Sequence, residues 1–420
     1  MRRRALLVIC LAVFVDMLGF GIILPLLPFH AEQLGGSGLW VGGVLTAYAA
    51  AQFIAAPVLG ALSDRFGRRP VLLAALAGSA VSLALTGIAG SLITLFAARL
   101  VAGLFGGAIP VAQAYVVDLT EPQERTRALG LVGASIGMGF VFGPALGAVL
   151  SGLGFAGVSF VAGGIALANF IAGWMLLPRS AAPAPADRVS AGSDERPGEQ
   201  QDATPEPGGE RVTPGGSPAL LVSALRVSAL RPVLVAIFAV TFAFVGMEAT
   251  YALLGERLYG LGPAGLGMVF TGVGVVMAVV QGGLVGRLSA RYGDRRVAVA
   301  GTLLMCVGLA VLPLGVAWLN YAGLVVLAAG QGLVTTTTAA LIAELGGSAL
   351  GGTFGVGQSA SAAARATGPI AAGAAFDVHL GLPFYLGVGL CVVAALLLHH
   401  RAGATVPAAR GVAEDEQTAS

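Results

Sequence analysis

The sequence predicts an all-α membrane protein in which twelve transmembrane helices form two parallel six-helix repeats, with both chain termini in the cytoplasm. The composition supports this class, because 56% of the residues are hydrophobic and only 10% are charged, whereas soluble domains carry about 25% charged residues. A chain of 420 residues also has room for about twelve spans of about 20 residues each. The third observation is internal repetition, because two short patterns of the first half recur in the second.

Long apolar runs mark the expected helices. In the first half they lie at 5–29, 39–62, 70–90, 92–117, 128–151 and 156–177. In the second half they lie at 232–254, 264–286, 297–318, 320–343, 353–375 and 381–399. We therefore expect one six-helix half over residues 1–177 and another over residues 232–400.

The segment between the halves differs in composition. Residues 178–231 are rich in Pro, Ala, Gly and Ser, which cannot bury a core, and we expect a disordered cytoplasmic linker there. Its last part, 218–231, has the pattern of a short amphipathic helix on the membrane surface. Residues 401–420 are expected to form a cytoplasmic tail.

The first apolar run follows three arginines, a pattern that also begins a secretory signal peptide. This run is too long for the hydrophobic region of a signal peptide and lacks a convincing cleavage site. It also contains Asp16, Pro25 and Pro28. We expect an uncleaved first span.

Arginine placement predicts the orientation, because cytoplasmic loops carry an excess of basic residues. With the N-terminus in the cytoplasm and the spans alternating, all but three of the 23 basic residues fall in cytoplasmic segments. The exceptions are Arg257, on the outer side, and Arg99 and Arg365, within spans. Every basic residue is arginine, and with abundant Gly and Ala this favours a GC-rich bacterial genome. The expected location is the bacterial cytoplasmic (inner) membrane, as a multi-pass protein.

A dense group of charges lies in residues 60–73, GALSDRFGRRPVLL. Four charges in six residues cannot enter hydrocarbon, so this stretch must be a tight loop at the membrane surface. Gly67 can supply a turn with positive φ, and Pro70 suits the first turn of a new helix. From these residues alone, a basic anchor loop and a functional loop are equally good interpretations. The residues of interest are Gly60, Asp64, Arg65, Gly67, Arg68 and Arg69.

The pattern GALSDRFG at 60–67 recurs as GRLSARYG at 286–293. A second echo, at nearly the same offset, pairs the glycines and Gly-Pro step of 130–144 with those of 355–369. Chance similarity in a chain rich in Gly and Ala is the competing explanation, but two echoes in one register argue against it. The halves therefore have the pattern of parallel repeats. In the second copy Ala290 replaces Asp64, so we assign the charged gating loop to the first half.

Four ionisable residues are expected inside the membrane, where a charge is costly and needs a partner or a task. Asp16 lies near mid-depth of the first span and Glu248 about two-thirds across the seventh. A carboxylate that faces a water-filled cavity there can take up and release protons, and the alternative is a structural carboxylate that stays paired. Arg99 and Arg365 can each pair with a carboxylate as an ion-pair switch, and a fixed structural role is equally open for Arg365.

Five glutamines inside the expected spans are weaker candidates for lining a substrate cavity. Most intramembrane glutamines simply bridge helices, and this alternative stays open for each of them. They are Gln52, Gln113, Gln281, Gln331 and Gln358.

The fifth span contains GMGFVFGPALG at 137–147, in which small residues follow one helix face around a proline. Generic glycine packing is one interpretation. Glycines also permit a close approach to the opposite half, and a proline removes a backbone donor and permits a kink. The residues are Gly139, Gly143, Pro144 and Gly147.

These patterns together resemble the major facilitator superfamily. The charged loop 60–69 is similar to the signature loop between spans two and three of that family. The span-five glycines and Pro144 resemble the motif of its drug:proton antiporters. Residues 16–28 and 98–130 resemble the corresponding parts of bacterial tetracycline-efflux proteins and related twelve-span multidrug exporters, and Arg99 matches their span-four motif.

The sequence departs from the tetracycline exporters in spans eight and nine. Those proteins commonly carry an ionisable residue there, whereas 264–286 and 297–318 contain no Asp, Glu, His or Lys. The roles of those groups cannot be carried over to this chain. Glu248 and Arg365 are candidates to replace them.

The resemblance implies a secondary active transporter that exports amphipathic drug-like molecules, including tetracycline-like ones, by proton-coupled alternating access. A proton-coupled carrier for a small metabolite and a membrane receptor without transport are the alternatives. No nucleotide loop, metal-ligand spacing or nucleophile constellation is present in the sequence, so we expect no enzyme activity, cofactor or metal. The expected partners are a small-molecule substrate, protons and the lipid bilayer, without nucleic acid, and the expected state is a monomer.

Overall fold

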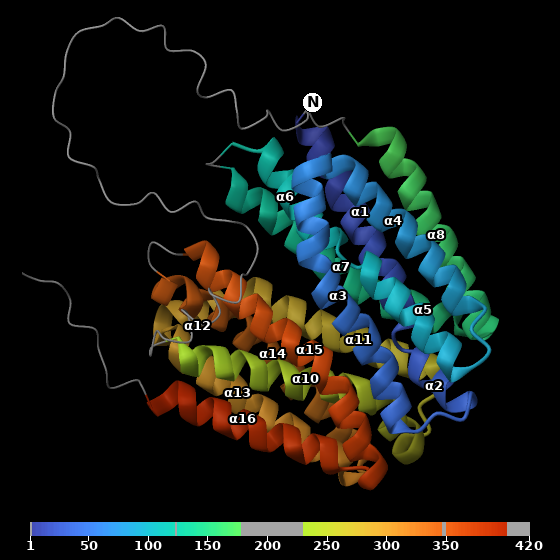
Figure 1. The fold of residues 1–420 in the computed structure, drawn as a ribbon. Helices are drawn as coiled ribbons and strands as arrows, with labels where there is room; N and C mark the ends of the chain where they lie inside the picture. The colour runs from blue at the N-terminus through green and yellow to red at the C-terminus, as the bar shows by residue number, and fades with distance from the viewer. Residues whose placement is uncertain (1, 122–123, 178–229, 347–349, 401–420) are drawn as a thin grey trace, which may run out of the picture.

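The computed structural model describes residues 2–121, 124–177, 230–346 and 350–400. Two helical bundles pack against each other, one from each half of the chain (Figure 1). The expected linker and its surface helix fall almost wholly within 178–229, and the expected tail is 401–420, so both lie outside the described residues. The limits of the two halves stay a prediction.

Eight α-helices of the first half are described. The first expected span divides into two helices around Pro25, and the fourth divides at Gly106 and Gly107. Their bounds are α1 Arg2–Ile23, α2 Leu27–Gln33, α3 Gly38–Phe66, α4 Arg68–Gly87, α5 Leu92–Phe105, α6 Ala108–Leu119, α7 Arg125–Leu150 and α8 Gly154–Leu176.

The described second half contains seven α-helices. A π-helical segment, Val280–Leu284, joins α11 to α12, so these form one continuous rod. The bounds are α10 Arg231–Tyr259, α11 Pro263–Val279, α12 Val285–Tyr292, α13 Asp294–Val311, α14 Ala317–Gly346, α15 Leu350–Val378 and α16 Leu382–His400.

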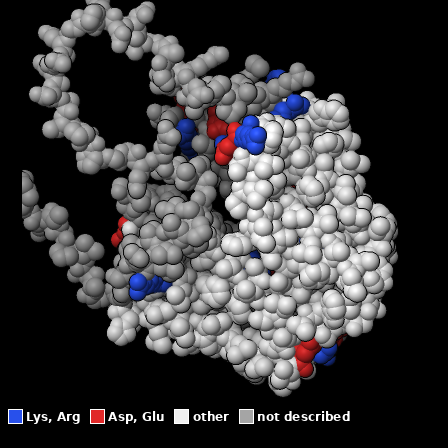
Figure 2. Space-filling view, viewed as in Figure 1, with Lys and Arg blue, Asp and Glu red and all other residues white. Residues whose placement is uncertain are grey.

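Ten segments of the described chain are long and apolar enough to cross a membrane. One of them, Arg127–Leu176, contains both α7 and α8, and α15 is not among the ten although it is 29 residues long. On the face seen in Figure 2, most charged side chains lie near the helix ends, with a broad uncharged surface between them. The helices therefore suit a multi-pass membrane protein, and the count of twelve spans stays a prediction.

The two sequence echoes have the same backbone turn. Gly67, between α3 and α4, has φ 94° and ψ 153°, and Gly293, between α12 and α13, has φ 83° and ψ 147°. A residue with a side chain rarely adopts these angles, so glycine is required at both turns. This shared geometry supports the interpretation of the halves as repeats.

The halves touch mainly along two helix pairs, α3 with α15 and α7 with α11, and α10 makes smaller contacts with α2 and α3. At one end of the molecule these contacts are backbone to backbone. A Cβ atom added at Gly38 would lie 2.7 Å from the carbonyl oxygen of Gly373, and one added at Gly42 would collide with the carbonyl of Pro369. We call this the closed end, and it holds the start of α3 and the C-terminal end of α15.

The same helices separate toward the other end, which we call the open end. On α7, a Cβ at Gly137 or Gly133 would meet no described atom within 4 Å, and the same is true at Gly282 and Gly286 across the gap. Figure 1 shows the two bundles diverging in this direction, and Figure 2 shows the surface hollowed between them. Within the described residues, the halves therefore meet at the closed end and part at the open end.

Candidate functional site

The predicted intramembrane charges fall into two groups on opposite walls of the space between the halves. Asp16, on α1, is 8% exposed and accepts a hydrogen bond of 2.8 Å from the Ser79 hydroxyl of α4. No arginine of the described chain lies within ion-pair distance of its carboxylate. Asp16 is therefore held by a neutral partner inside the first half.

Arg99, on α5, is 4% exposed and has no carboxylate partner among the described residues. Its guanidinium carbon lies 5.0 Å from the ring centroid of Tyr48 and 6.0 Å from that of Phe20, and its Nε has no hydrogen-bond partner. Two aromatic faces thus stabilise a buried cation. The expected pairing of Arg99 with a carboxylate is absent in this conformation.

Tyr48 and Gln52 connect this arginine to the chain around it. Gln52 donates hydrogen bonds to the carbonyl oxygen of Gly106, at 2.7 Å, and to the Tyr48 hydroxyl, at 3.3 Å. The first of these bonds satisfies a carbonyl at the break between α5 and α6. Gln52 therefore bridges helices, which is the alternative that the sequence left open for it.

Glu248 and Arg365 form the second charged group, on α10 and α15 of the second half. The two side chains interact electrostatically but do not approach within 4 Å. Arg365 is exposed to the space between the halves, and it also interacts with Tyr48 of the first half. The structure thus brings one predicted acid and one predicted base together and keeps Asp16 and Arg99 apart.

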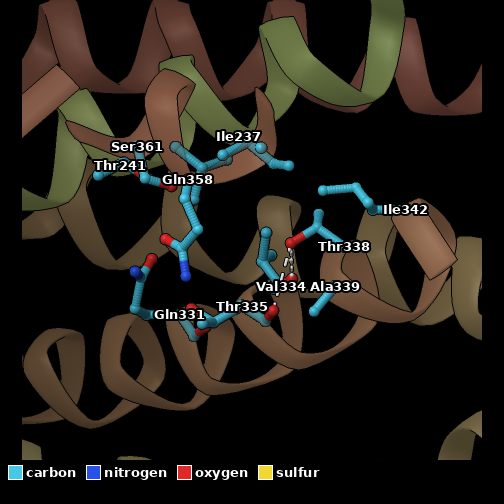
Figure 3. A pocket seen from close by; sticks show the side chains of 12 residues that line it. Ile237, Thr241, Gln331, Val334, Thr335, Thr338, Ala339, Ile342, Gln358 and Ser361 are labelled. Carbon is cyan, nitrogen blue, oxygen red and sulfur yellow. Dashed lines mark hydrogen bonds between the residues drawn. The ribbon is translucent and has the colours of Figure 1, made fainter. Parts of the chain in front are cut away.

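A cavity of about 140 Å³ lies between α10, α14 and α15 (Figure 3). The predicted residues Gln331 and Gln358 both line it, and Figure 3 shows their amide groups pointing toward one another. Gln113 and Gln281 lie elsewhere, on α6 and in the π-helical segment. Four further polar residues in the lining were not predicted: Thr241, Thr335, Thr338 and Ser361.

The charged loop holds the first half together at the open end. Arg68 pairs with Asp64 at 2.5 Å and with Asp118 of α6 at 2.8 Å. Arg69 donates to the Trp174 carbonyl of α8, and Arg65 lies over the ring of its neighbour Phe66. Asp118 was not predicted, because it follows an apolar run and belongs to no recognisable motif. These contacts tie α3 and α4 to the helices beside them.

The span-five glycines contact a different partner from the one expected. Added Cβ atoms at Gly139 and Gly143 would strike α1 at Met17 and Gly21, and Gly147 lies equally close to α1. The expectation that these glycines approach the opposite half is therefore wrong. It is the stretch around Pro144, on another face of α7, that meets Gly267 of α11 across the halves.

The closed end carries polar contacts that the sequence did not indicate. Asp377, at the end of α15, accepts hydrogen bonds from the backbone amides of Gly38 and Leu39, at 2.7 and 2.8 Å. Arg257 of α10 pairs with Glu32 of α2 at 3.3 Å. Within the described ranges, no group of three or more His, Cys, Asp or Glu side chains could hold a metal ion.

The fold and this arrangement of charges are those of a membrane transporter. The family model described as Major Facilitator Superfamily matches residues 9–285 and 256–418, and the chain belongs to this family.

Two curated relatives are resistance proteins by name. The class C tetracycline resistance protein of Escherichia coli is 30% identical over 339 residues, covering 78% of each chain. Multidrug resistance protein 2 of Bacillus subtilis is 25% identical over 408 residues, covering 93% of this chain and 95% of the relative.

Solved structures share the fold. The human organic anion transporter MFSD10 aligns with a TM-score of 0.64 at 24% identity, over 94% of this chain and 99% of that one. A bacterial homologue of the human lysosomal transporter Spinster aligns with a TM-score of 0.73 at 14% identity, over 94% and 96% of the two chains. These relatives and structural neighbours are transporters or resistance proteins by name. The chain is a multi-pass membrane protein of the major facilitator superfamily.

Proposed function

We propose that this protein exports amphipathic, drug-like molecules from the bacterial cytoplasm in exchange for protons, by alternating access of its two halves. The observation that carries the proposal is the pair of Glu248 and Arg365 in the second half, of which Arg365 also interacts with Tyr48 of the first half, beside halves that meet at one end and part at the other. The resistance-protein relatives favour drugs as the substrate class.

The orientation expected from the arginines places the open end, with Asp64 and Arg68, in the cytoplasm. In that orientation the structure is an inward-open state, and twelve spans bring both chain termini to the cytoplasmic side. Export requires the halves to part at the closed end and meet at the open end.

Protonation of Asp16 or Glu248 is the proposed coupling step. A proton on Glu248 removes its attraction for Arg365, which then becomes free to interact more strongly with the first half. Asp16, held by the Ser79 hydroxyl, changes its hydrogen bonding when it gains a proton. Either event alters the relative stability of the inward-open and outward-open states.

The test uses purified protein in proteoliposomes, with proton movement recorded after addition of a drug panel that includes tetracycline. Wild type is compared with Asp16→Asn and Glu248→Gln. We expect drug-evoked proton movement in wild type and its loss in at least one variant. Active, correctly oriented protein that moves no protons with any drug would contradict the proposal and favour the small-metabolite carrier.

A second candidate is transport of organic anions. The observation that favours it is the buried Arg99 without a carboxylate partner, together with Arg365 exposed to the same space. The solved neighbour MFSD10 is an organic anion transporter by title. Transport of an anionic dye but not of tetracycline by the same proteoliposomes would select this alternative.

A further inference from the structure

The cavity between α10, α14 and α15 differs in chemistry from the nearby charged pair, Glu248 and Arg365. Twelve residues line the cavity, and none of them is charged (Figure 3). Half are polar and neutral: Thr241, Gln331, Thr335, Thr338, Gln358 and Ser361. A neutral polar lining suits a ligand that forms hydrogen bonds without an ion pair.

Two of the three threonines of this cavity, Thr335 and Thr338, can accept hydrogen bonds but have already used their own protons. The Thr335 hydroxyl donates to the carbonyl of Gln331 at 2.8 Å, and the Thr338 hydroxyl donates to that of Val334 at 2.7 Å. A hydroxyl has one proton and two lone pairs. Each of these hydroxyl oxygens can therefore still accept a hydrogen bond from a ligand.

Gln331 adds an unsatisfied acceptor. The residue is 8% exposed, and its side-chain oxygen is buried without a hydrogen-bond partner. Leaving such a group unpaired is unfavourable, and a rotation of the Gln331 side chain toward a donor in the cavity would pair it. The threonines and Gln331 thus call for the same chemistry in a ligand, an N–H or O–H group.

The size of the cavity limits what enters it. A volume of about 140 Å³ is smaller than the roughly 300–1,000 Å³ of pockets that hold whole drug-sized ligands. The rest of a substrate must lie outside. Thr241 and Glu248 are two helical turns apart on one face of α10, and Ser361 and Arg365 are one turn apart on α15, so the cavity leads toward the charged pair.

We propose that this cavity binds a neutral hydrogen-bond donor of the substrate, a hydroxyl or carboxamide group, while the ionisable part of the same molecule lies toward Glu248 and Arg365. The assignment rests on the proposed transport function and narrows its substrate class. It selects amphipathic molecules that carry a neutral donor about 6–10 Å from an ionisable group, the rise of four to seven helical residues.

The experiment measures the half-saturation concentration and the maximal rate of tetracycline transport in proteoliposomes. We expect Gln331→Leu and Thr335→Val to raise the half-saturation concentration about tenfold, the value of one hydrogen bond, with little change in maximal rate. Thr335→Ser keeps the hydroxyl and should behave as wild type.

The matched control is Thr302→Val on α13. Thr302 is also buried and donates to the carbonyl four residues earlier, at 2.8 Å, but it does not line the cavity. Half-saturation concentrations equal to that of Thr302→Val in both cavity variants would overturn the assignment. Wild-type protein that transports neither tetracycline nor any other drug of the panel would instead overturn the proposed drug export, and this assignment with it.

Discussion

Asp377 and Gly38 join the two halves at the closed end, although 339 positions separate them in the chain. The Asp377 carboxylate accepts the Gly38 amide at 2.7 Å and the next amide at 2.8 Å, so it caps the N-terminus of α3 from the opposite half. Free amides and the helix dipole both favour an anion at this position. The contact can exist only while the closed end stays closed.

Asp377→Asn is expected to favour opening of the closed end. Loss of the charge should weaken the cap by about 1 kcal/mol, which changes the ratio of the two states about fivefold. The measurement is the labelling rate of Thr46→Cys by a membrane-impermeant maleimide, since Thr46 accepts a hydrogen bond from the Ile370 amide within this interface. Glu344→Gln, a loss of charge near the open end of the same half, is the control. Equal labelling rates with and without Asp377→Asn would refute a role for the cap.

Gly42→Ala should prevent the closed end from forming. The added Cβ would collide with the carbonyl oxygen of Pro369 and lie 2.7 Å from its carbonyl carbon, and the backbone cannot yield as a flexible side chain can. We expect transport to fall at least tenfold with normal amounts of protein in the membrane. The neighbouring Gly43→Ala supplies a matched control, because its Cβ meets no described atom within 4 Å. Identical transport rates in the two variants would show that this close approach is dispensable.

Glu32→Gln is expected to change little. Its ion pair with Arg257 also crosses the halves, but the two side chains are 24% and 48% exposed and 3.3 Å apart. Exposed ion pairs contribute about 0–1 kcal/mol, and the middle of that range, about 0.5 kcal/mol, should change the Thr46→Cys labelling rate only about twofold. If Glu32→Gln changed the labelling rate more than Asp377→Asn does, the ion pair would stabilise the closed end more than the Asp377 cap, against this expectation.

Asp64→Asn should abolish export while the protein remains in the membrane. In the outward-open state we expect Asp64 to face the start of α15, where the helix dipole favours an anion, and the variant loses that attraction. In the inward-open state Arg68 keeps Asp118, so folding should be preserved. Transport by this variant, normalised to the amount in the membrane, is the measurement. Full activity would exclude this attraction between Asp64 and the start of α15 as a requirement for export.

The sequence located most helices because hydrophobic runs determine them locally. Breaks at Pro25 and at Gly106 were not assigned, since a proline or a glycine pair within an apolar run is compatible with either a kink or a break. The conformational state was beyond prediction, because it depends on which residues of α3 meet α15. The hydrogen bonds of Asp377 could not be predicted either, because its partner Gly38 lies 339 positions away in the chain.

The sequence predicted only part of the candidate site, because residue types are visible in the sequence and their three-dimensional pairing is not. Charged residues inside a membrane are conspicuous, so Asp16, Arg99, Glu248 and Arg365 were found, but their pairing depends on how the helices are rotated. Thr335 and Thr338 were missed because threonine is common in membrane helices, where it bonds to its own backbone. The run of four threonines at 335–338, one turn beyond Gln331, was the signal available.

The two repeats keep one backbone turn and differ in what surrounds it. At Gly67 the turn carries the cluster of Asp64, Arg68 and Asp118, whereas at Gly293 the matching position of Asp64 is an alanine. The residues that line the polar cavity all belong to the second half. A chimera built from two copies of the first half would therefore keep a glycine turn in each copy and would lack the cavity proposed to bind the hydrogen-bond donor of the substrate.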